Sequence, residues 1–368
     1  MIAKTVRMRI IDNGGGGDRF SMRWILTKKR ANSGFLMALS ALALALCTGC
    51  PVVDNRPAPG QLIQQTDPEY GQDYHLYVPS RYNKARSWPL VITCHGTKPW
   101  DTADGQVDQW KGLAEEKGFL IAAPELIGTK GDFPPPPDEQ IRRQLADEKT
   151  ILSVVKAIRA ARQVDEGRVF LTGWSAGAYA VLFTGLRNPD TFRAIAISQG
   201  NFNPAYLEPC IPFIDRYQPV NVVYNSEDIL VKADAPACIE WLRNQGMQPV
   251  VLERPGIHRR DSDPIFAFFA DCVRRIPWIR VYVDYDPVDP MEVAFGVRSS
   301  FEPTRFLWDF GDETRASLPA PRHRYEKPGR YLAKVALWAP NGKSYVRQLS
   351  LQVPPVRLGA PASAPAGS

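Results

Sequence analysis

Between residues 74 and 277, short apolar runs alternate with longer amphipathic stretches, and this pattern restricts the fold more than any other feature. The apolar runs lie at residues 90–94, 119–123, 169–172, 194–198, 220–224 and 250–253. Amphipathic stretches such as 147–161 and 233–245 separate them. Continuous apolar strands alternating with helices are typical of a parallel sheet covered on both faces. The sequence therefore predicts an α/β fold, a doubly wound and mostly parallel sheet, over residues 71–277.

A proline-rich segment interrupts this pattern at residues 128–138. Residues 134–137 are consecutive prolines. Proline has no N–H to donate and clashes with the preceding turn of a helix. We therefore expect the whole segment to be a surface loop.

After Pro277 the pattern changes to short segments of alternating polarity. The β-rich segments at residues 279–286, 291–297, 304–312, 330–339 and 344–353 are separated by turn residues. This alternation predicts a small antiparallel β-sandwich over residues 279–353. The Pro- and Ala-rich residues 354–368 are expected to be a disordered tail.

The first 50 residues have the features of an export signal. A basic flank, Lys28-Lys29-Arg30, precedes an apolar run at 35–46, which is shorter than the roughly 20 residues of a membrane span. The run ends in Cys47-Thr48-Gly49-Cys50, which resembles a bacterial lipobox, although Cys47 stands where leucine is usual. The resemblance implies lipidation at Cys50 and a membrane-anchored lipoprotein of the bacterial cell envelope. The proline-rich composition that follows indicates a tether over residues 51–70. A plain signal peptide or an uncleaved anchor is the alternative, and Met22 is an alternative start.

The charge and the histidine content exclude other classes of partner. The formal charge of +6 is concentrated before residue 31, and no basic stripe interleaved with aromatic residues follows. Nucleic acid is therefore not an expected partner. The chain has 4 histidines and no zinc-type cysteine pair after residue 50, so we predict neither a metal nor a cofactor.

Four cysteines would enter an oxidising compartment if the chain is exported. They are Cys94, Cys210, Cys238 and Cys272. Disulfides persist in such compartments, and the sequence does not choose among the possible pairings. Cys94 lies in an apolar run and fits a buried free thiol equally well.

The strongest catalytic signal is the turn Gly173-Trp174-Ser175-Ala176-Gly177. It directly follows an apolar strand and precedes an apolar helical stretch. A sharp strand-to-helix turn of this kind presents a serine hydroxyl above the edge of the sheet. The N–H of Ala176 then lies at a helix N-terminus, where an oxyanion is stabilised. We therefore predict Ser175 as a nucleophile.

A second oxyanion donor is expected at the end of an earlier strand. Residues 90–94 run into His95-Gly96-Thr97, and hydrolases of this fold place a backbone N–H there. We assign that donor to Thr97. His95 itself is expected to be structural.

A serine nucleophile needs a base, and the base needs an orienting acid. In this fold the chain order is serine, acid, histidine. Of the histidines after Ser175, His323 belongs to the β-sandwich, so we predict His258 as the base. The acid should follow residues 220–224, where Glu227 and Asp228 are adjacent.

Two families are similar to parts of this chain. Residues 72–276 resemble extracellular α/β-hydrolases, which include polyhydroxyalkanoate depolymerases, feruloyl esterases and acetyl xylan esterases. That resemblance rests on Tyr77-Val78-Pro79, Trp88-Pro89-Leu90-Val91-Ile92, His95-Gly96, Ala122-Ala123-Pro124-Glu125, Arg168-Val169-Phe170 and the serine turn. Residues 279–353 resemble a PKD domain through Trp308-Asp309-Phe310-Gly311-Asp312, His323-Arg324-Tyr325 and Pro328-Gly329-Arg330-Tyr331.

These resemblances imply an activity. The hydrolase family cleaves carboxylic esters, here on an acylated polysaccharide or a polyester, and its Gly-x-x-Asp pattern favours Asp228 over Glu227 as the acid. Trp174 and Ala178 depart from the family's usual residues and leave the substrate undefined. The PKD resemblance implies a spacer or a contact to glycan or protein. Two alternatives are a peptidase of the same fold and a catalytically inactive surface scaffold.

Overall fold

The computed structural model describes residues 60–131 and 135–355. The predicted export signal, Cys50, most of the tether and the tail from residue 356 lie outside the described residues. No helix in the described part of the chain is long and apolar enough to cross a membrane.

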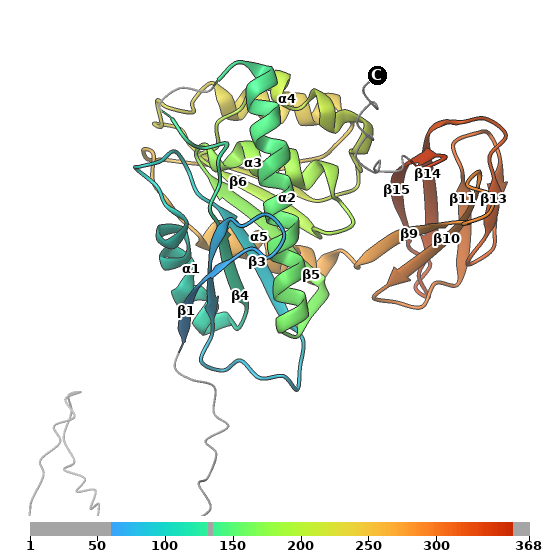
Figure 1. Ribbon diagram of the computed structural model, residues 1–368, viewed down its shortest axis with the longest axis horizontal. Coiled ribbons are helices and arrows are strands. Elements are labelled where there is room, and N and C mark those ends of the chain that lie inside the picture. The colour runs from blue at the N-terminus through green and yellow to red at the C-terminus, as the bar shows by residue number, and fades with distance from the viewer. Residues whose placement is uncertain (1–59, 132–134, 356–368) are drawn as a thin grey trace, which may run out of the picture. The chain divides into compact units, whose positions relative to one another are not determined.

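The first part of the chain forms an 8-stranded sheet (Figure 1). Its strands β3 to β8 pair in parallel in the order β4-β3-β5-β6-β7-β8, and the antiparallel β1 and β2 extend the sheet beyond β4. This confirms the predicted mostly parallel sheet. The strand bounds are β1 (Gln61–Thr66), β2 (Asp73–Val78), β3 (Trp88–Cys94), β4 (Leu120–Pro124), β5 (Val164–Trp174), β6 (Ala194–Ser198), β7 (Val220–Asn225) and β8 (Val250–Arg254).

Helices cover both faces of this sheet. One buried cluster joins the sheet to the helices α2 (Pro137–Ala161), α3 (Gly177–Arg187) and α4 (Asp234–Asn244). A second cluster on the other face joins it to α1 (Ala103–Lys117) and α5 (Asp263–Arg275). Two short 3-10 helices, η1 (Pro204–Tyr206) and η2 (Glu208–Phe213), follow β6. The alternating side chains of each strand therefore meet apolar surface on both sides.

The structure corrects two details of the prediction. Helix α2 begins at Pro137, inside the segment expected to be a loop. Proline is tolerated there because the first N–H groups of a helix have no intrahelical acceptor. The edge strand β8 is also not fully covered, because Val250 to Leu252 expose between 37% and 53% of their surface.

The second part of the chain is a β-sandwich of a 3-stranded sheet, β13-β10-β9, and a 4-stranded sheet, β12-β11-β14-β15. Trp308 and Tyr325 are fully buried between the sheets. His323 stacks on Phe310 and contacts the Asp312 carboxylate at 2.7 Å, so it belongs to the sandwich as predicted. The strands are β9 (Ile279–Tyr285), β10 (Glu292–Ser299), β11 (Arg305–Asp309), β12 (Arg315–Ala316), β13 (Arg322–Arg324), β14 (Gly329–Trp338) and β15 (Ser344–Val353).

The cysteines of the described residues form no disulfide. Cys94, Cys210, Cys238 and Cys272 are buried free thiols. Burial raises the pKa of Cys238 and of Cys272 to about 12. Because the thiolate is the reactive form, these side chains are packing residues.

Candidate active site

The predicted serine turn joins β5 to α3 and has the strained backbone that such a turn requires. Ser175 has a φ of 53°, in the left-handed region. A Cβ on Gly177 would lie 2.3 Å from the carbonyl oxygen of Cys94. A Cβ on Gly173 would lie 2.8 Å from Cγ2 of Val181. Both glycines are therefore required for the turn to pass between β3 and α3.

Three predicted side chains meet at the carboxyl ends of the strands. The Oγ of Ser175 lies 3.1 Å from Nε2 of His258, and Nδ1 of His258 lies 2.5 Å from Oδ2 of Asp228. The carboxylate of Asp228 accepts the Nδ1 hydrogen, which leaves Nε2 as an acceptor facing the serine hydroxyl. The order of residues in the sequence leaves Glu227 open as the acid. Its side chain is exposed, and the structure places Asp228, which is buried, against the histidine.

The two residues predicted as oxyanion donors differ in how they are placed: Ala176 directly follows the serine, and Thr97 lies on the loop after β3. Within the described residues, neither the N–H of Ala176 nor that of Thr97 donates a hydrogen bond. Gly96, just before Thr97, is close enough that a Cβ there would lie 3.2 Å from Cβ of Ser175. Ala176 therefore offers an unused N–H at the N-terminus of α3, directly after the serine, and the loop that carries Thr97 passes close to the serine at Gly96.

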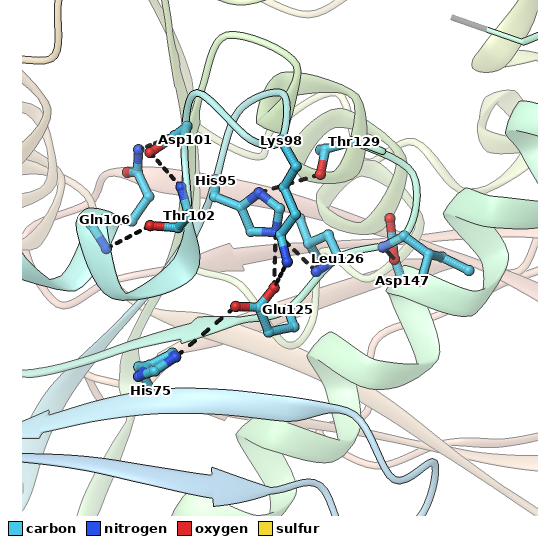
Figure 2. Close-up of polar contacts among 12 residues, drawn as sticks. His75, His95, Lys98, Asp101, Thr102, Gln106, Glu125, Leu126, Thr129 and Asp147 are labelled. Atoms are coloured by element: carbon cyan, nitrogen blue, oxygen red, sulfur yellow. Dashed lines mark hydrogen bonds and ion pairs between the residues drawn. The ribbon is translucent and has the colours of Figure 1, made fainter. Parts of the chain in front are cut away.

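The side chain of His95 connects the loop after β3 to the residues that follow β4 (Figure 2). Its ring is fully buried, its Nε2 accepts the N–H of Leu126 at 3.0 Å, and its Nδ1 lies 2.8 Å from the carbonyl oxygen of Gly96. Burial lowers its pKa, so the ring is neutral, with the proton on Nδ1. Oε2 of Glu125 lies 3.8 Å from Nε2 of His95. The same carboxylate forms an ion pair with Lys98, which belongs to the loop after β3. His95 thus ties the loop to the segment that follows β4.

The stabilising effect of His95 is expected to depend on pH. Because its pKa in the folded state lies below the ordinary 6.5, the unfolded chain binds the proton more tightly. The stabilisation is therefore complete above pH ~6.5 and decreases as the pH falls toward the folded-state pKa. We predict that the difference in free energy of unfolding between the wild type and His95→Gln is largest at neutral pH and smaller at pH ~5.

Urea unfolding of both proteins across this pH range measures that difference. Asp147 titrates in the same range, since burial raises its pKa to about 6, but it is present in both proteins and cancels. A difference that stays constant with pH would contradict the neutral, buried assignment of His95.

An ion pair that no motif indicated joins the loop after β3 to the loop after β8, which carries His258. Arg260 Nη2 lies 2.7 Å from Oδ1 of Asp101, and the guanidinium lies over the ring of Trp174 at 5.0 Å. The Trp174 ring in turn packs on His258 with centroids 4.5 Å apart. Asp101 is buried and also accepts the N–H of Gly96 at 2.6 Å. This contact chain therefore fixes Gly96 and His258 relative to each other.

Replacing Arg260 is expected to loosen both loops. Arg260→Gln should lower kcat about tenfold, because a small displacement of the oxyanion donor or the base weakens transition-state contacts. KM for a small ester should change less, and Arg260→Lys should restore part of kcat. The matched control is Arg274→Gln, which removes an exposed ion pair with Asp271 on α5. Equal kcat in Arg260→Gln and the control would contradict the positioning role.

The remaining aromatic and polar residues near the site differ in environment. Trp110 is buried against Phe119 and belongs to the core, whereas Trp100 is 67% exposed. Asn201, for which the sequence offered no functional signal, has its Oδ1 3.5 Å from the Ser175 hydroxyl and its Nδ2 3.2 Å from Oδ2 of Asp234.

No group of three or more side chains suited to bind a metal occurs within residues 60–131 and 135–355.

Comparison with known families agrees with this architecture. Residues 285–351 match the PKD domain, and residues 112–218 match the prolyl oligopeptidase family. The chain combines an α/β-hydrolase domain with a PKD domain. No curated protein matches it.

Solved structures similar to the hydrolase domain have low sequence identity. An S-formylglutathione hydrolase of Staphylococcus aureus is 13% identical with a TM-score of 0.45, over 58% of this chain and 96% of that one. A ferulic acid esterase of Anaeromyces mucronatus is 14% identical with a TM-score of 0.45, over 59% and 89%. Porphyromonas gingivalis dipeptidyl peptidase 4 is 14% identical with a TM-score of 0.43, over 59% of this chain and 35% of that one. The chain thus spans a minor part of the length of that peptidase.

Proposed function

We propose that this protein cleaves carboxylic esters by acyl transfer, with Ser175 as the nucleophile. The observation that carries the proposal is the continuous contact from Ser175 through His258 to the buried Asp228. A serine hydroxyl is a weak nucleophile, and a hydrogen-bonded imidazole oriented by a carboxylate is the arrangement that activates it.

The first half of the reaction forms an acyl-enzyme. Oγ of Ser175 attacks the ester carbonyl carbon as Nε2 of His258 takes its proton, and Asp228 stabilises the resulting imidazolium. Negative charge develops on the carbonyl oxygen, where the N–H groups of Ala176 and Thr97 can bind it. Such a donor is worth roughly 3 kcal/mol in the transition state. The tetrahedral intermediate then expels the alcohol, which leaves with the proton from His258.

The second half regenerates the serine. Water attacks the acyl carbon while Nε2 of His258 takes a water proton, and a second tetrahedral intermediate forms at the same oxyanion donors. Its collapse releases the carboxylic acid, and the proton returns to Oγ of Ser175. All groups that bind or move a proton in these steps belong to the chain.

A peptidase is the second candidate, because residues 112–218 match the prolyl oligopeptidase family. The ester proposal is supported by the esterase-like motifs from Tyr77 to the serine turn. Matched p-nitrophenyl esters and p-nitroanilides of the same acyl groups separate the two. We expect Ser175-dependent hydrolysis of the esters and no Ser175-dependent hydrolysis of the anilides. Because a serine peptidase also cleaves activated esters, Ser175-dependent cleavage of the anilides is the result that would identify a peptidase.

We further propose that the protein acts in the cell envelope, held by a lipid on Cys50. The support is the lipobox-like end of the apolar run at 35–46. The PKD domain would then serve as a spacer or contact glycan or protein. Mass spectrometry of the mature N-terminus tests the anchor. A lipid-modified Cys50 is expected, and a mature chain that begins at another residue contradicts it.

A further inference from the structure

Two buried carboxamide side chains lie at the carboxyl ends of β6 and β7, and neither takes part in the proton transfers. Gln199 directly follows β6 and is 2% exposed, and Asn225 is the last residue of β7 and is 4% exposed. A buried polar side chain gives up its hydrogen bonds to water and therefore needs partners within the protein. The partners of these two side chains show what each of them holds in place.

Asn225 joins the loop of the acid to the loop of the base. Its Nδ2 donates to the carbonyl oxygen of Ile257 at 2.7 Å, and Ile257 directly precedes His258. Its own carbonyl oxygen accepts the N–H of Asp228 at 3.1 Å. One residue thus contacts Asp228 itself and the immediate neighbour of His258.

Gln199 connects Asn225 to the serine turn. Its Oε1 accepts the N–H of Asn225 at 2.9 Å. Its backbone has a φ of 49°, in the left-handed region that residues other than glycine rarely adopt. The residues on either side of it contact the nucleophile, since the N–H of Ser175 donates to Ser198 at 3.1 Å and the N–H of Asn201 donates to the carbonyl oxygen of Ser175 at 3.2 Å. The strained backbone of Gln199 therefore lies between two contacts to Ser175, while its side chain reaches Asn225.

We propose that Asn225, held by Gln199, is a positioning residue that fixes His258 and Asp228 relative to each other and to Ser175. This rests on the proposed function and adds two residues to its site. An imidazole activates a serine only while both of its nitrogens keep their geometry, and a small displacement weakens the transition-state contacts. The Gly-x-x-Asp pattern of the resembling hydrolases has glycine at position 225, and glycine has no side chain that could make this contact.

Asn225→Ala tests the proposal against a matched control on the same strand. Asn221 lies earlier on β7, is 2% exposed, and its Nδ2 donates to the carbonyl oxygen of Val250 on β8 at 2.8 Å. Asn221→Ala therefore removes the same kind of buried contact at the opposite end of β7. We expect both variants to lose a similar amount of free energy of unfolding, because each leaves one carbonyl oxygen without its side-chain donor.

Only Asn225→Ala should affect the reaction. With p-nitrophenyl acetate, its kcat should fall about tenfold and its KM should change less than about twofold, whereas kcat of Asn221→Ala should stay within about twofold of the wild type. The loss is partial because the N–H of Glu227 still donates to the carbonyl oxygen of Gly256 at 3.1 Å and keeps the two loops in contact. Equal kcat in the two variants would overturn the proposal.

A double substitution separates positioning from a general loosening of the fold. In the Asp228→Asn background the orienting carboxylate is already absent, so adding Asn225→Ala should lower kcat by less than about twofold. A further tenfold loss in that background would contradict an action through Asp228 and His258. Gln199→Leu removes the acceptor of the Asn225 N–H and provides a second variant, with the same expected effect on kcat as Asn225→Ala.

The rate of labelling by a fluorophosphonate distinguishes a failure of this proposal from a failure of the proposed function, because labelling needs the activated serine but no ester substrate. The rate should fall about tenfold in Asn225→Ala and stay within about twofold of the wild type in Asn221→Ala. Equal labelling rates in the two variants would refute the positioning role. Slower labelling of Asn225→Ala, in a protein without Ser175-dependent ester hydrolysis, would refute the proposed ester cleavage alone.

Discussion

Ser175→Ala is expected to lower kcat for p-nitrophenyl acetate by at least about 10⁴-fold, because the substitution removes the atom that forms the acyl-enzyme. The oxyanion donors remain, so a small residual rate above that of water is compatible with the proposal. Initial rates of the purified wild type and variant measure the effect.

The control is Ser226→Ala, in the loop before Asp228, where the hydroxyl makes one long contact with the carbonyl oxygen of Arg254 at 3.4 Å. Its rate should stay within about twofold of the wild type. The thermal unfolding midpoint of Ser175→Ala should stay close to that of the wild type, because the change removes one hydroxyl contact with His258 and no apolar packing. A Ser175→Ala protein that is folded and retains its rate would contradict the mechanism.

Asp228→Asn is expected to lower kcat by about 10³- to 10⁴-fold. An amide at this position can donate to Nδ1 of His258, which favours the tautomer with its proton on Nε2. That tautomer cannot accept the proton of Ser175. The neighbouring Glu227→Gln makes the same chemical change on an exposed side chain and should leave kcat within about twofold. The pair therefore compares two adjacent carboxylates in one loop.

The effect of Asp228→Asn should be mainly on kcat, because the carboxylate contacts the base and not the substrate. KM for p-nitrophenyl acetate should remain within a few-fold of the wild type. If Glu227→Gln lost as much activity as Asp228→Asn, the buried contact with His258 would not identify the orienting acid.

The positions of the serine and the histidine could be predicted because local signals mark them. A serine flanked by glycines between a strand and a helix indicates a tight strand-to-helix turn. In the structure, a Cβ on Gly177 would clash with Cys94 and a Cβ on Gly173 would clash with Val181. His258 followed from chain order. The choice between Glu227 and Asp228 depends on which side chain turns inward, and burial is a property of the folded loop.

The contact between Asp101 and Arg260 could not be predicted from the sequence. The two residues are far apart in the chain, each looks like an ordinary loop charge, and no fixed spacing relates them. They meet because parallel strands bring their carboxyl ends to one edge of the sheet. The start of α2 at Pro137 is hard to predict for a different reason, since a proline run argues against a helix interior but permits a helix start.

Labelling with a fluorophosphonate tests directly whether Ser175 is an activated nucleophile. The oxygen of a serine whose proton is removed by an adjacent base attacks the phosphorus of the reagent, and fluoride leaves. We expect stoichiometric labelling of the wild type, with the phosphonyl group on the peptide containing Ser175, and no labelling of Ser175→Ala. A folded wild type that does not react, as an inactive scaffold would not, or a label on another residue, would contradict the activation of Ser175.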